Sequence, residues 1–516
     1  MELIDERTGA AAISLRRVLA LQQVDHPASV VTRACRQVGT RVALRAADQP
    51  DAARSPAADV LGRLAEKAYG YRTDRGRVAR RAAAAGAMYP TEVLWLTRER
   101  GRWQLFVHDF TLQRSLRRDD DAEALAAMLA LAPEQTALLP VAVVWRTVQR
   151  YGFRGYRYCV LDAAQVIGNV SALATAAGMV CSQAAIDHPE KFSRHLGLSQ
   201  NELLMPVLLL GGGLERLGEI PWAGSTSDPR AGATTESLEE PPGLSPVMTR
   251  VHRLHRSSEP RADQLLDLGG LTESGTLAQA LLDLERRASA RSFGHDPLDE
   301  HQLAALRTEI GDFLRNLPAG VRDVVDVRLV RREGTILTAE PLASGRRNPP
   351  DHSTVGRSAE QLELIFAKQP LAATAAGYVI VGLRSGGSNK PIELSSYRQG
   401  LLLAGLLSSR LYRYCVSAGV ATTAVGGFDD QATAALAGGG FTPLIVQAIG
   451  NHPCASHPDL GGADPLPIGP GLKNDQLAAS WLLAGDINST QRGPTPHEID
   501  PLVRLDPINH SERHLP

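Results

Sequence analysis

Three residues of the stretch Arg287-Ala-Ser289-Ala-Arg291 could together bind a phosphate group. Guanidinium groups are planar donors that suit phosphate oxygens, and a serine hydroxyl between them adds a further donor. The stretch lies just before DPLDEHQLAAL, whose pattern predicts the start of a helix. An isolated pattern of this kind is also typical of a solvated basic turn, so the motif alone leaves both interpretations open.

A pair of glycines, Gly426 and Gly427, follows the β-rich run GVATTAV. Because glycine has no Cβ, the backbone amides at such a pair can approach a planar ligand closely. The same pair on its own also fits an ordinary turn.

Two further motifs carry groups that could contact a ligand or move a proton. Ala85-Gly86-Ala87 begins the turn AGAMYP, which leads into the predicted strand VLWLT. Arg150 and Tyr151 begin the segment RYGFRGYRY, which leads into a predicted helix. The hydroxyl of Tyr151 could exchange a proton, whereas an arginine stays protonated and cannot act as a base. Arg150 and Tyr151 would equally suit a surface pair at the start of a helix.

No metal site is expected from the sequence. His452, Cys454 and His457 are close together, but their spacing matches no standard zinc pattern. The chain also has no P-loop and no GxGxxG motif after a strand, so nucleotide binding of those two kinds is not predicted.

An internal repeat organises the motifs along the chain. The pentapeptide YRYCV occurs at 156–160 and at 412–416, but the residues that follow its two copies disagree. A displacement of 241 residues, which aligns Tyr156 with Tyr397, instead brings two helical patterns into register. One copy of the pentapeptide is therefore predicted to begin a helix and the other to end one.

The ends of the two repeats also correspond. Both helical patterns end in Ala-Gly, at Gly178 and Gly419, where glycine supplies a left-handed cap. Each half then closes with an apolar strand, predicted to begin at Pro206 in one copy and at Pro443 in the other.

Composition divides the chain into five parts. The least periodic stretch is rich in Pro, Ser, Thr and Gly, and it is predicted to be a linker without a core of its own. The predicted parts are an extension (1–55), a first α/β domain (56–220), the linker (221–262), a second α/β domain (263–450) and a tail (451–516).

Bulk composition excludes several classes of protein. The 516 residues include 55 basic and 56 acidic ones, so no electrostatic grip on nucleic acid or on an anionic membrane is expected. Five scattered cysteines form no disulfide framework and fit a reducing compartment. No apolar run reaches the length of a membrane helix, and no signal peptide is recognised. These features predict a cytoplasmic protein.

Taken together and in this order, the four motifs resemble those of the nitroreductase-like flavoproteins. More narrowly they resemble the SagB/McbC-type dehydrogenases, which oxidise azoline rings in modified peptides to thiazoles and oxazoles. AGAMYP and RYGFRGYRY carry the narrower resemblance, whereas the Arg287–Arg291 motif and VGGFDD are general to the fold. The resemblance implies an α+β fold with two tandem nitroreductase-like α-β-α domains that form an intramolecular pseudo-dimer.

The resemblance also gives the duplication a meaning. Such proteins are usually homodimers that bind FMN at the subunit interface, and here each half keeps motifs for only one side of that site. The resemblance implies that Arg287, Ser289 and Arg291 bind the FMN phosphate and ribityl chain, that Gly426 and Gly427 face the flavin ring, and that Ala85, Gly86 and Ala87 close the ring from the other side. One working site and one abandoned site are therefore expected, in a monomer with an internal pseudo-dimer or in a homodimer.

The implied activity is FMN-dependent oxidation of azoline rings in a peptide substrate, with a cyclodehydratase as a possible partner. The family's Lys-Tyr pair, linked with proton transfer, reads Arg150-Tyr151 here. Two roles stay open for this pair: Tyr151 could still act in proton transfer, or Arg150 could only orient the substrate. Two alternatives stay open: an NAD(P)H-dependent reductase of nitro, quinone or dehydroamino-acid substrates, and a pseudo-dimer without catalysis that binds a peptide or a partner enzyme.

Overall fold

The computed structural model describes residues 55–74, 77–110, 113–118, 121–220, 244–256, 265–272, 275–342, 353–384 and 394–453. Two α/β halves follow each other along the chain, the N-terminal half up to residue 220 and the C-terminal half from residue 265. The predicted extension and most of the predicted tail, including Cys454 and His457, lie outside the described residues.

The N-terminal half consists of α2 (Pro56–Tyr69), β1 (Tyr71–Asp74), β2 (Arg77–Arg80), η3 (Ala85–Ala87), β3 (Thr91–Glu99), β4 (Arg102–Asp109), β5 (Arg114–Arg118), α3 (Ala122–Met128), β6 (Thr136–Val143), α4 (Trp145–Tyr151), η4 (Gly152–Arg154), α5 (Gly155–Ala176), β7 (Val180–Gln183), α6 (Pro189–His195), β8 (Glu202–Leu204), β9 (Leu208–Gly211) and η5 (Leu214–Glu219).

After α7 (Ser245–Arg256), the C-terminal half consists of α8 (Leu268–Thr272), α9 (Leu277–Arg286), α10 (Glu300–Arg315), α11 (Ala319–Arg322), β10 (Val325–Glu333), β11 (Ile336–Pro341), β12 (Ser353–Gly356), α12 (Ala359–Ile365), α13 (Pro370–Ala373), β13 (Gly377–Arg384), α14 (Leu394–Ser417), β14 (Ala421–Val425), α15 (Asp430–Leu436) and β15 (Phe441–Gly450).

The two halves have the same sheet topology. The strand order is β5-β4-β3-β6-β9-β7 in the first sheet and β12-β11-β10-β13-β15-β14 in the second, with all pairs antiparallel. The displacement of 241 residues carries the bounds of β6 onto those of β13, and the start of β7 onto the start of β14. The predicted duplication of an α+β unit is therefore confirmed.

Each sheet is buried on both faces because its strands alternate between two cores. In β13, Val379 and Val381 join the central core, whereas Tyr378 and Ile380 join an outer one. Side chains of successive residues point to opposite faces of a strand, which explains why such strands read as continuous apolar runs. The helices α12, α13 and α15 cover the outer face of the second sheet, and α3 and α6 cover that of the first.

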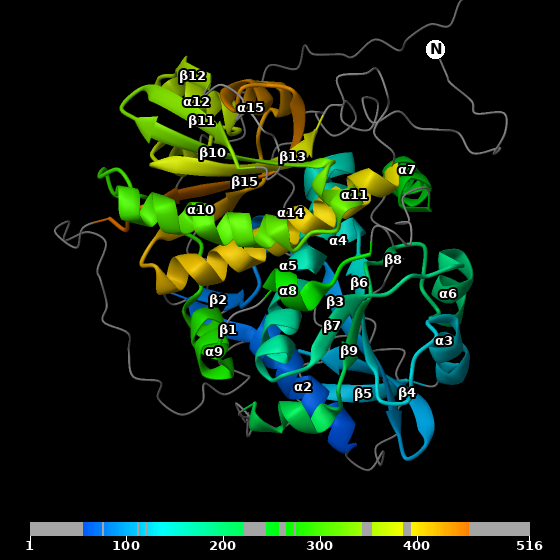
Figure 1. The fold of residues 1–516 in the computed structure, drawn as a ribbon. Helices are drawn as coiled ribbons and strands as arrows, with labels where there is room; N and C mark the ends of the chain where they lie inside the picture. The colour runs from blue at the N-terminus through cyan, green and yellow to red at the C-terminus, as the bar shows by residue number, and fades with distance from the viewer. Residues whose placement is uncertain are drawn as a thin grey trace, which may run out of the picture.

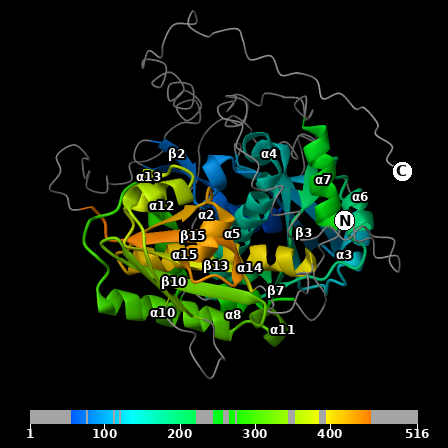
Figure 2. The same cartoon turned by 90° about the horizontal axis from the view of Figure 1, so that it is seen from above.

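The two long helices α5 and α14 lie between the sheets, each packed on its own sheet and on the other helix (Figures 1 and 2). A Cβ added to Gly405 would lie 2.4 Å from the Cβ of Ala164, and one added to Gly168 would lie 2.7 Å from the Oγ of Ser409. In both pairs the partners are equivalent positions of the repeat, so the helices cross close to a pseudo-twofold axis.

One stretch, Trp145–Ala176, is long and apolar enough by composition to cross a membrane, but 89% of its most apolar window is buried inside the protein. It comprises α4, η4 and α5, and α5 packs between the two sheets as a core helix.

Both predicted closing strands need correction, and proline is the reason. The strand expected from Pro206 starts two residues later, as β9, and a separate short strand, β8, precedes the proline. Both pair with β6, on either side of Met205–Val207. The strand expected from Pro443 starts two residues earlier, and the register shifts where Pro443 pairs with Gly382. Since proline has no N–H to donate, it interrupts a ladder or sits at a bulge.

Part of the predicted linker is ordered. Residues Ser245–Arg256 form α7, which packs against α4 and η4 and buries Met248, Val251 and Leu254. These three apolar residues are spaced three apart, so they form one apolar face of an amphipathic helix within a Pro-rich and Ser-rich segment. The N-terminal half provides the surface that buries this face.

The repeated pentapeptide behaves as predicted. Its first copy begins α5 and its second copy ends α14. Gly178 and Gly419 follow these helices with φ angles of 82° and 66°, which confirms the predicted left-handed caps.

Candidate functional site

The turn between β2 and β3 has an unusual backbone. Gly86, Ala87 and Tyr89 have φ angles of 58°, 55° and 45°. Left-handed conformations cost energy for residues that carry a Cβ and gather at functional sites. At Gly86 a Cβ would also lie 2.3 Å from the hydroxyl oxygen of Tyr151, so only glycine fits there.

Arg150 and Tyr151 end the short helix α4 and lie beside this turn. The guanidinium carbon of Arg150 is 5.3 Å from the centroid of the Tyr151 ring, and Arg150 has no hydrogen bond or ion pair with any residue that the structure describes. Burial raises the pKa of Tyr151 to about 12. At neutral pH Tyr151 is therefore a proton donor rather than a base.

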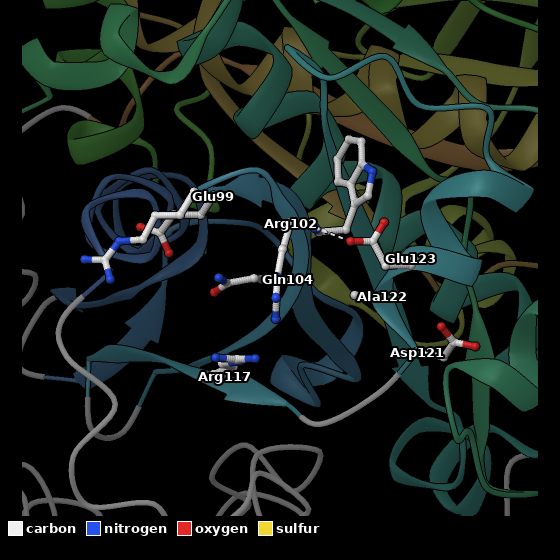
Figure 3. Close-up of a pocket in the computed structure, with 9 residues that line it drawn as sticks. Glu99, Arg102, Gln104, Arg117, Asp121, Ala122 and Glu123 are labelled. Carbon is white, nitrogen blue, oxygen red and sulfur yellow. Dashed lines mark hydrogen bonds between the residues drawn. The ribbon is translucent and has the colours of Figure 1, made fainter.

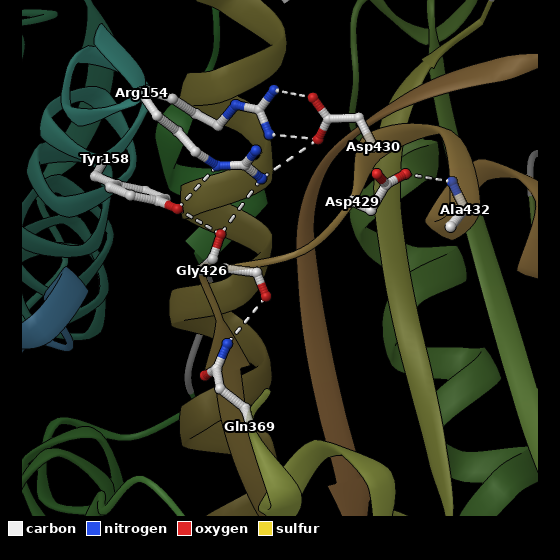
Figure 4. Close-up of polar contacts among 9 residues, drawn as sticks. Arg154, Tyr158, Gln369, Gly426, Asp429, Asp430 and Ala432 are labelled. Atoms are coloured by element: carbon white, nitrogen blue, oxygen red, sulfur yellow. Dashed lines mark hydrogen bonds and ion pairs between the residues drawn. The ribbon is translucent and has the colours of Figure 1, made fainter. Parts of the chain in front are cut away.

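The loop after β14 carries the predicted glycine pair, and both of its carbonyls are held by side chains (Figure 4). The hydroxyl of Tyr158 donates to the carbonyl of Gly426 at 2.5 Å, and the amide of Gln369 donates to the carbonyl of Gly427 at 2.9 Å. Because C=O and N–H point in opposite directions in a trans peptide, the amide of Gly427 points away from Tyr158. This amide donates to no backbone carbonyl among the described residues.

A buried ionic cluster fixes the same loop from the opposite half. Arg157 donates to both carboxylate oxygens of Asp430 at 3.1 Å, and Arg154 donates to one of them at 3.3 Å. The three side chains are at least nine-tenths buried. Arg154 also donates to the hydroxyl of Tyr158, 2.9 Å away. The start of α5 is thus tied to the start of α15, and two guanidinium groups share one carboxylate.

The predicted phosphate motif, Arg287 to Arg291, lies beside Tyr412 of α14. Arg287 is buried, its guanidinium carbon is 5.1 Å from the centroid of the Tyr412 ring, and it donates to the carbonyl of Arg80 at 3.3 Å. Ser289 is half-buried, with its hydroxyl 3.0 Å from that of Tyr412. Arg291 is exposed.

These elements enclose one cavity of about 600 Å³ between the two halves. Of the ten predicted site residues, seven line it: Ala85, Gly86, Arg150, Tyr151, Ser289, Gly426 and Gly427. Ala87, Arg287 and Arg291 do not line it. The lining side chains that were not predicted as site residues include Tyr158, at the end of the motif RYGFRGYRY, and Asp162, Gln165 and Tyr412, which lie outside the motifs.

The equivalent position in the other half of the repeat is built differently. Gln399 stands where Tyr158 stands in the first half, and its amide donates to Gln183 at 3.0 Å. Pro189 stands at the position of Asp430, so the ionic cluster cannot be repeated, and Arg398 donates instead to the carbonyl of Leu204. The two halves therefore share a topology but not a site.

A second hollow of about 410 Å³ lies on the outside of the N-terminal half (Figure 3). Its walls come from β3, β4, β5 and α3, and most of its side chains are exposed and carry charges of both signs. Glu123 accepts a hydrogen bond from the backbone of Trp103 there. Because none of the four motifs contributes to it, the inter-half cavity is the candidate site.

No protein-family model matches the chain, and a search of the curated proteins gives no match. The solved structures that resemble it have the nitroreductase fold. A protein from Anabaena variabilis assigned as a nitroreductase has a TM-score of 0.56 at 17% identity, over 81% of this chain and 92% of that chain. Since 81% exceeds either half, the match runs through both of them and supports the same fold over the matched part.

Two further structures match smaller parts of the chain. Nitroreductase A from Vibrio parahaemolyticus has a TM-score of 0.28 at 14% identity, over 42% of this chain and 86% of that chain. The E. coli microcin synthetase McbBCD complex with truncated pro-MccB17 bound has a TM-score of 0.26 at 20% identity, over 30% of this chain and 62% of that chain.

Proposed function

We propose that this protein is an FMN-dependent dehydrogenase that oxidises azoline rings of a ribosomal peptide precursor to azoles. One observation carries the proposal. The turn at Ala85–Gly86 and the segment Arg150–Tyr151 from one half face the pair Gly426–Gly427 from the other half across a single cavity. The resembled flavoproteins divide the same motifs between two subunits.

The residues around the cavity fit FMN. Its volume of about 600 Å³ lies in the range of small-molecule and cofactor sites. Ser289 lines the cavity and offers its hydroxyl to a phosphate, and Arg287, which does not line the cavity, donates to that hydroxyl at 3.5 Å. The amide of Gly427 is a donor for the edge of a flavin ring. FMN, when bound, supplies an acceptor for two electrons and a hydrogen. Arg291, which is exposed, would reach the phosphate only at the rim.

The remaining polar groups would act on the substrate. Arg150 keeps its charge at any physiological pH and has donors to spare, so it would orient a carbonyl or carboxylate of the peptide. Tyr151, protonated at neutral pH, would donate a hydrogen bond to a ring heteroatom. The proposal also includes a cytoplasmic location for the protein and a cyclodehydratase as its partner enzyme.

The state of Tyr151 also supports a second candidate, a reductase of the same fold that takes its electrons from NAD(P)H. Reduction of an acceptor needs a proton donor beside the site of hydride addition, and a tyrosine with a pKa of about 12 suits that task better than proton removal. The two candidates differ in the direction of electron transfer: the dehydrogenase takes electrons from its substrate, whereas the reductase delivers them to its substrate.

The visible absorbance of the freshly purified protein tests the flavin part of the proposal. Flavin bands are expected in the wild type and in Arg286→Ala, whose side chain is exposed, and they should be lost in Arg287→Ala. A colourless wild type that takes up no added FMN would overturn both candidates. Under anaerobic conditions, bleaching by a thiazoline peptide supports the dehydrogenase, whereas bleaching by NADPH alone supports the reductase.

A further inference from the structure

The cavity contains a carboxylate that no motif explains. Asp162, on α5, lines the cavity and is 5% exposed. Its two oxygens lie 3.1 and 3.2 Å from the backbone nitrogen of Ala85, which donates to them. Among the residues that the structure describes, no lysine, arginine or histidine forms an ion pair with it. Asp430, the carboxylate of the ionic cluster described above, has two guanidinium partners in contrast.

Such an arrangement is costly for folding. Burial of a carboxylate without a cation penalises its charged form, and here burial raises the pKa of Asp162 well above its usual value, with only the Ala85 amide opposing the shift. The titratable groups that interact with its charge are Tyr151 from α4, Tyr69 from α2 and Cys159 from α5 itself. Arg150 lines the same cavity. A buried carboxyl with a raised pKa that lines a cavity is typical of a functional group.

A second polar group lies on the same face of α5. Gln165 follows Asp162 by three residues, so the two side chains are neighbours on the helix surface. Gln165 is 4% exposed, lines the cavity, and its Oε1 atom has no hydrogen-bond partner in the described structure. A buried acceptor without a partner costs free energy unless a ligand provides the donor.

We propose that Asp162 accepts the proton released when the bound substrate is oxidised, and that Gln165 accepts a hydrogen bond from an N–H of the same bound molecule. This inference rests on the proposed dehydrogenase function and supplies the base that Tyr151, protonated at neutral pH, does not provide. The substrate class is a ring with adjacent C–H groups beside an amide, as in a peptide azoline.

The step balances with the flavin as oxidant. One ring C–H bond breaks with both electrons, and the hydrogen leaves as a hydride to the bound flavin. The neighbouring C–H bond breaks with its proton going to the Asp162 carboxylate, and its electron pair forms the new ring double bond. Asp162 then returns the proton to solvent.

Asp162 could instead only hold the Ala85 turn, and an isosteric replacement separates the two roles. Asp162→Asn keeps an oxygen that accepts from the Ala85 amide but cannot take a proton. Asp162→Glu restores the carboxyl, and Asp187→Asn removes an exposed carboxyl of the same kind elsewhere. Each variant is first checked for folding and for the absorption spectrum of bound FMN.

Two readouts then decide. In anaerobic mixing with a thiazoline peptide, Asp162→Asn is expected to bind FMN like the wild type but to bleach it at least about 100-fold more slowly, with partial rescue in Asp162→Glu and none needed in Asp187→Asn. Bleaching within about tenfold of the wild-type rate would leave Asp162 only its positioning role and overturn the inference.

The second readout needs no substrate. In infrared difference spectra between acidic and neutral pH, the wild type is expected to show a carboxyl band that titrates well above the pH of ordinary aspartates and that is missing in Asp162→Asn. A carboxyl that ionises in the ordinary acidic range would overturn the inference even if the protein binds FMN. Loss of FMN binding in the wild type would instead count against the proposed function.

Discussion

The hydroxyl of Tyr158, in the N-terminal half, donates a hydrogen bond of 2.5 Å to the carbonyl of Gly426, in the C-terminal half. The two residues are 268 positions apart in the sequence. Through this bond and the neighbouring Arg154 and Arg157, the first turn of α5 sets the position of the loop that faces the cavity. Several measurable properties depend on this connection.

Removal of the carboxylate from the ionic cluster should lower the stability of the protein strongly. Asp430→Ala leaves two guanidinium groups buried without their carboxylate, and loss of one partner of a buried pair typically lowers the free energy of unfolding by about 3–5 kcal/mol. Its neighbour Asp429→Ala removes only the N-cap of α15, which typically costs about 1 kcal/mol. Chemical denaturation of both variants checks the difference, and equal losses would contradict it.

Gly86 should tolerate no side chain without a change in the cavity. Gly86→Ala forces a left-handed alanine and brings a Cβ to 2.3 Å from the Tyr151 hydroxyl. Gly101→Ala is the matched control, since Gly101 has a φ of 82° and open space around its Cβ position. The left-handed alanine is expected to cost each variant about 1 kcal/mol of stability. The contact with Tyr151 adds to this loss in Gly86→Ala alone. Only Gly86→Ala should weaken ligand binding in the cavity, as measured by titration with FMN.

The contact between the two long helices should be equally sensitive. In Gly405→Ala the new methyl group would meet Ala164 of α5 at 2.4 Å, and overpacking of this kind costs about 1–3 kcal/mol. Gly311→Ala, in the middle of α10, meets only the flexible end of Arg315. It should raise stability by about 0.5–1 kcal/mol, because alanine is the better helix former. Thermal unfolding should therefore show shifts of opposite sign.

Tyr151→Phe should separate the two directions of electron flow. Because burial raises the pKa of Tyr151 to about 12, its hydroxyl keeps its proton at neutral pH. Loss of that proton donor is expected to slow substrate reduction by about 100-fold or more, and to change the rate of oxidation by less than about tenfold. Tyr414, whose pKa burial also raises to about 12, lies outside the cavity, so Tyr414→Phe should change neither rate.

Asp162→Asn should make the protein more stable at neutral pH. A folded-state pKa above the unfolded value means that the folded protein binds more protons, so stability falls as the pH rises from the unfolded to the folded pKa. Removal of this carboxyl is therefore expected to raise the free energy of unfolding at pH 7. The gain should disappear as the pH falls below about 4, the usual pKa of an unfolded aspartate, because wild-type Asp162 is then protonated in both states. Denaturant titrations at several pH values measure the trend.

The internal repeat could be predicted from the sequence, and the family resemblance predicted that the motifs of its two halves lie at one site. Helix periodicity and the caps at Gly178 and Gly419 depend on local patterns and are present where they were predicted. The closing strands β9 and β15 each start two residues away from the predicted start. The juxtaposition of Gly86 with Gly426 depends on the packing of the two halves against each other, which only the family resemblance implied.

The functional groups that were not predicted from the sequence contact residues that are far away along the chain. Asp430 reads as the second residue of a helix start, and its partner Arg157 lies within a predicted helix 273 positions earlier. Asp162 reads as one polar residue in an apolar helix. The available signal was its spacing of four from Tyr158, which puts both on one face of α5, but only the packed structure turns that face to the cavity.

Both walls of the cavity belong to one polypeptide. A site made by two separate subunits weakens on dilution, because its assembly is a second-order process, whereas covalent linkage gives the second wall a fixed effective concentration. The ligand affinity of this cavity should therefore be independent of protein concentration, and each chain should bind one equivalent rather than two. Linkage also means that the surfaces equivalent to the cavity walls in the other half of the repeat do not have to bind a ligand. The residues of those surfaces are therefore free to diverge.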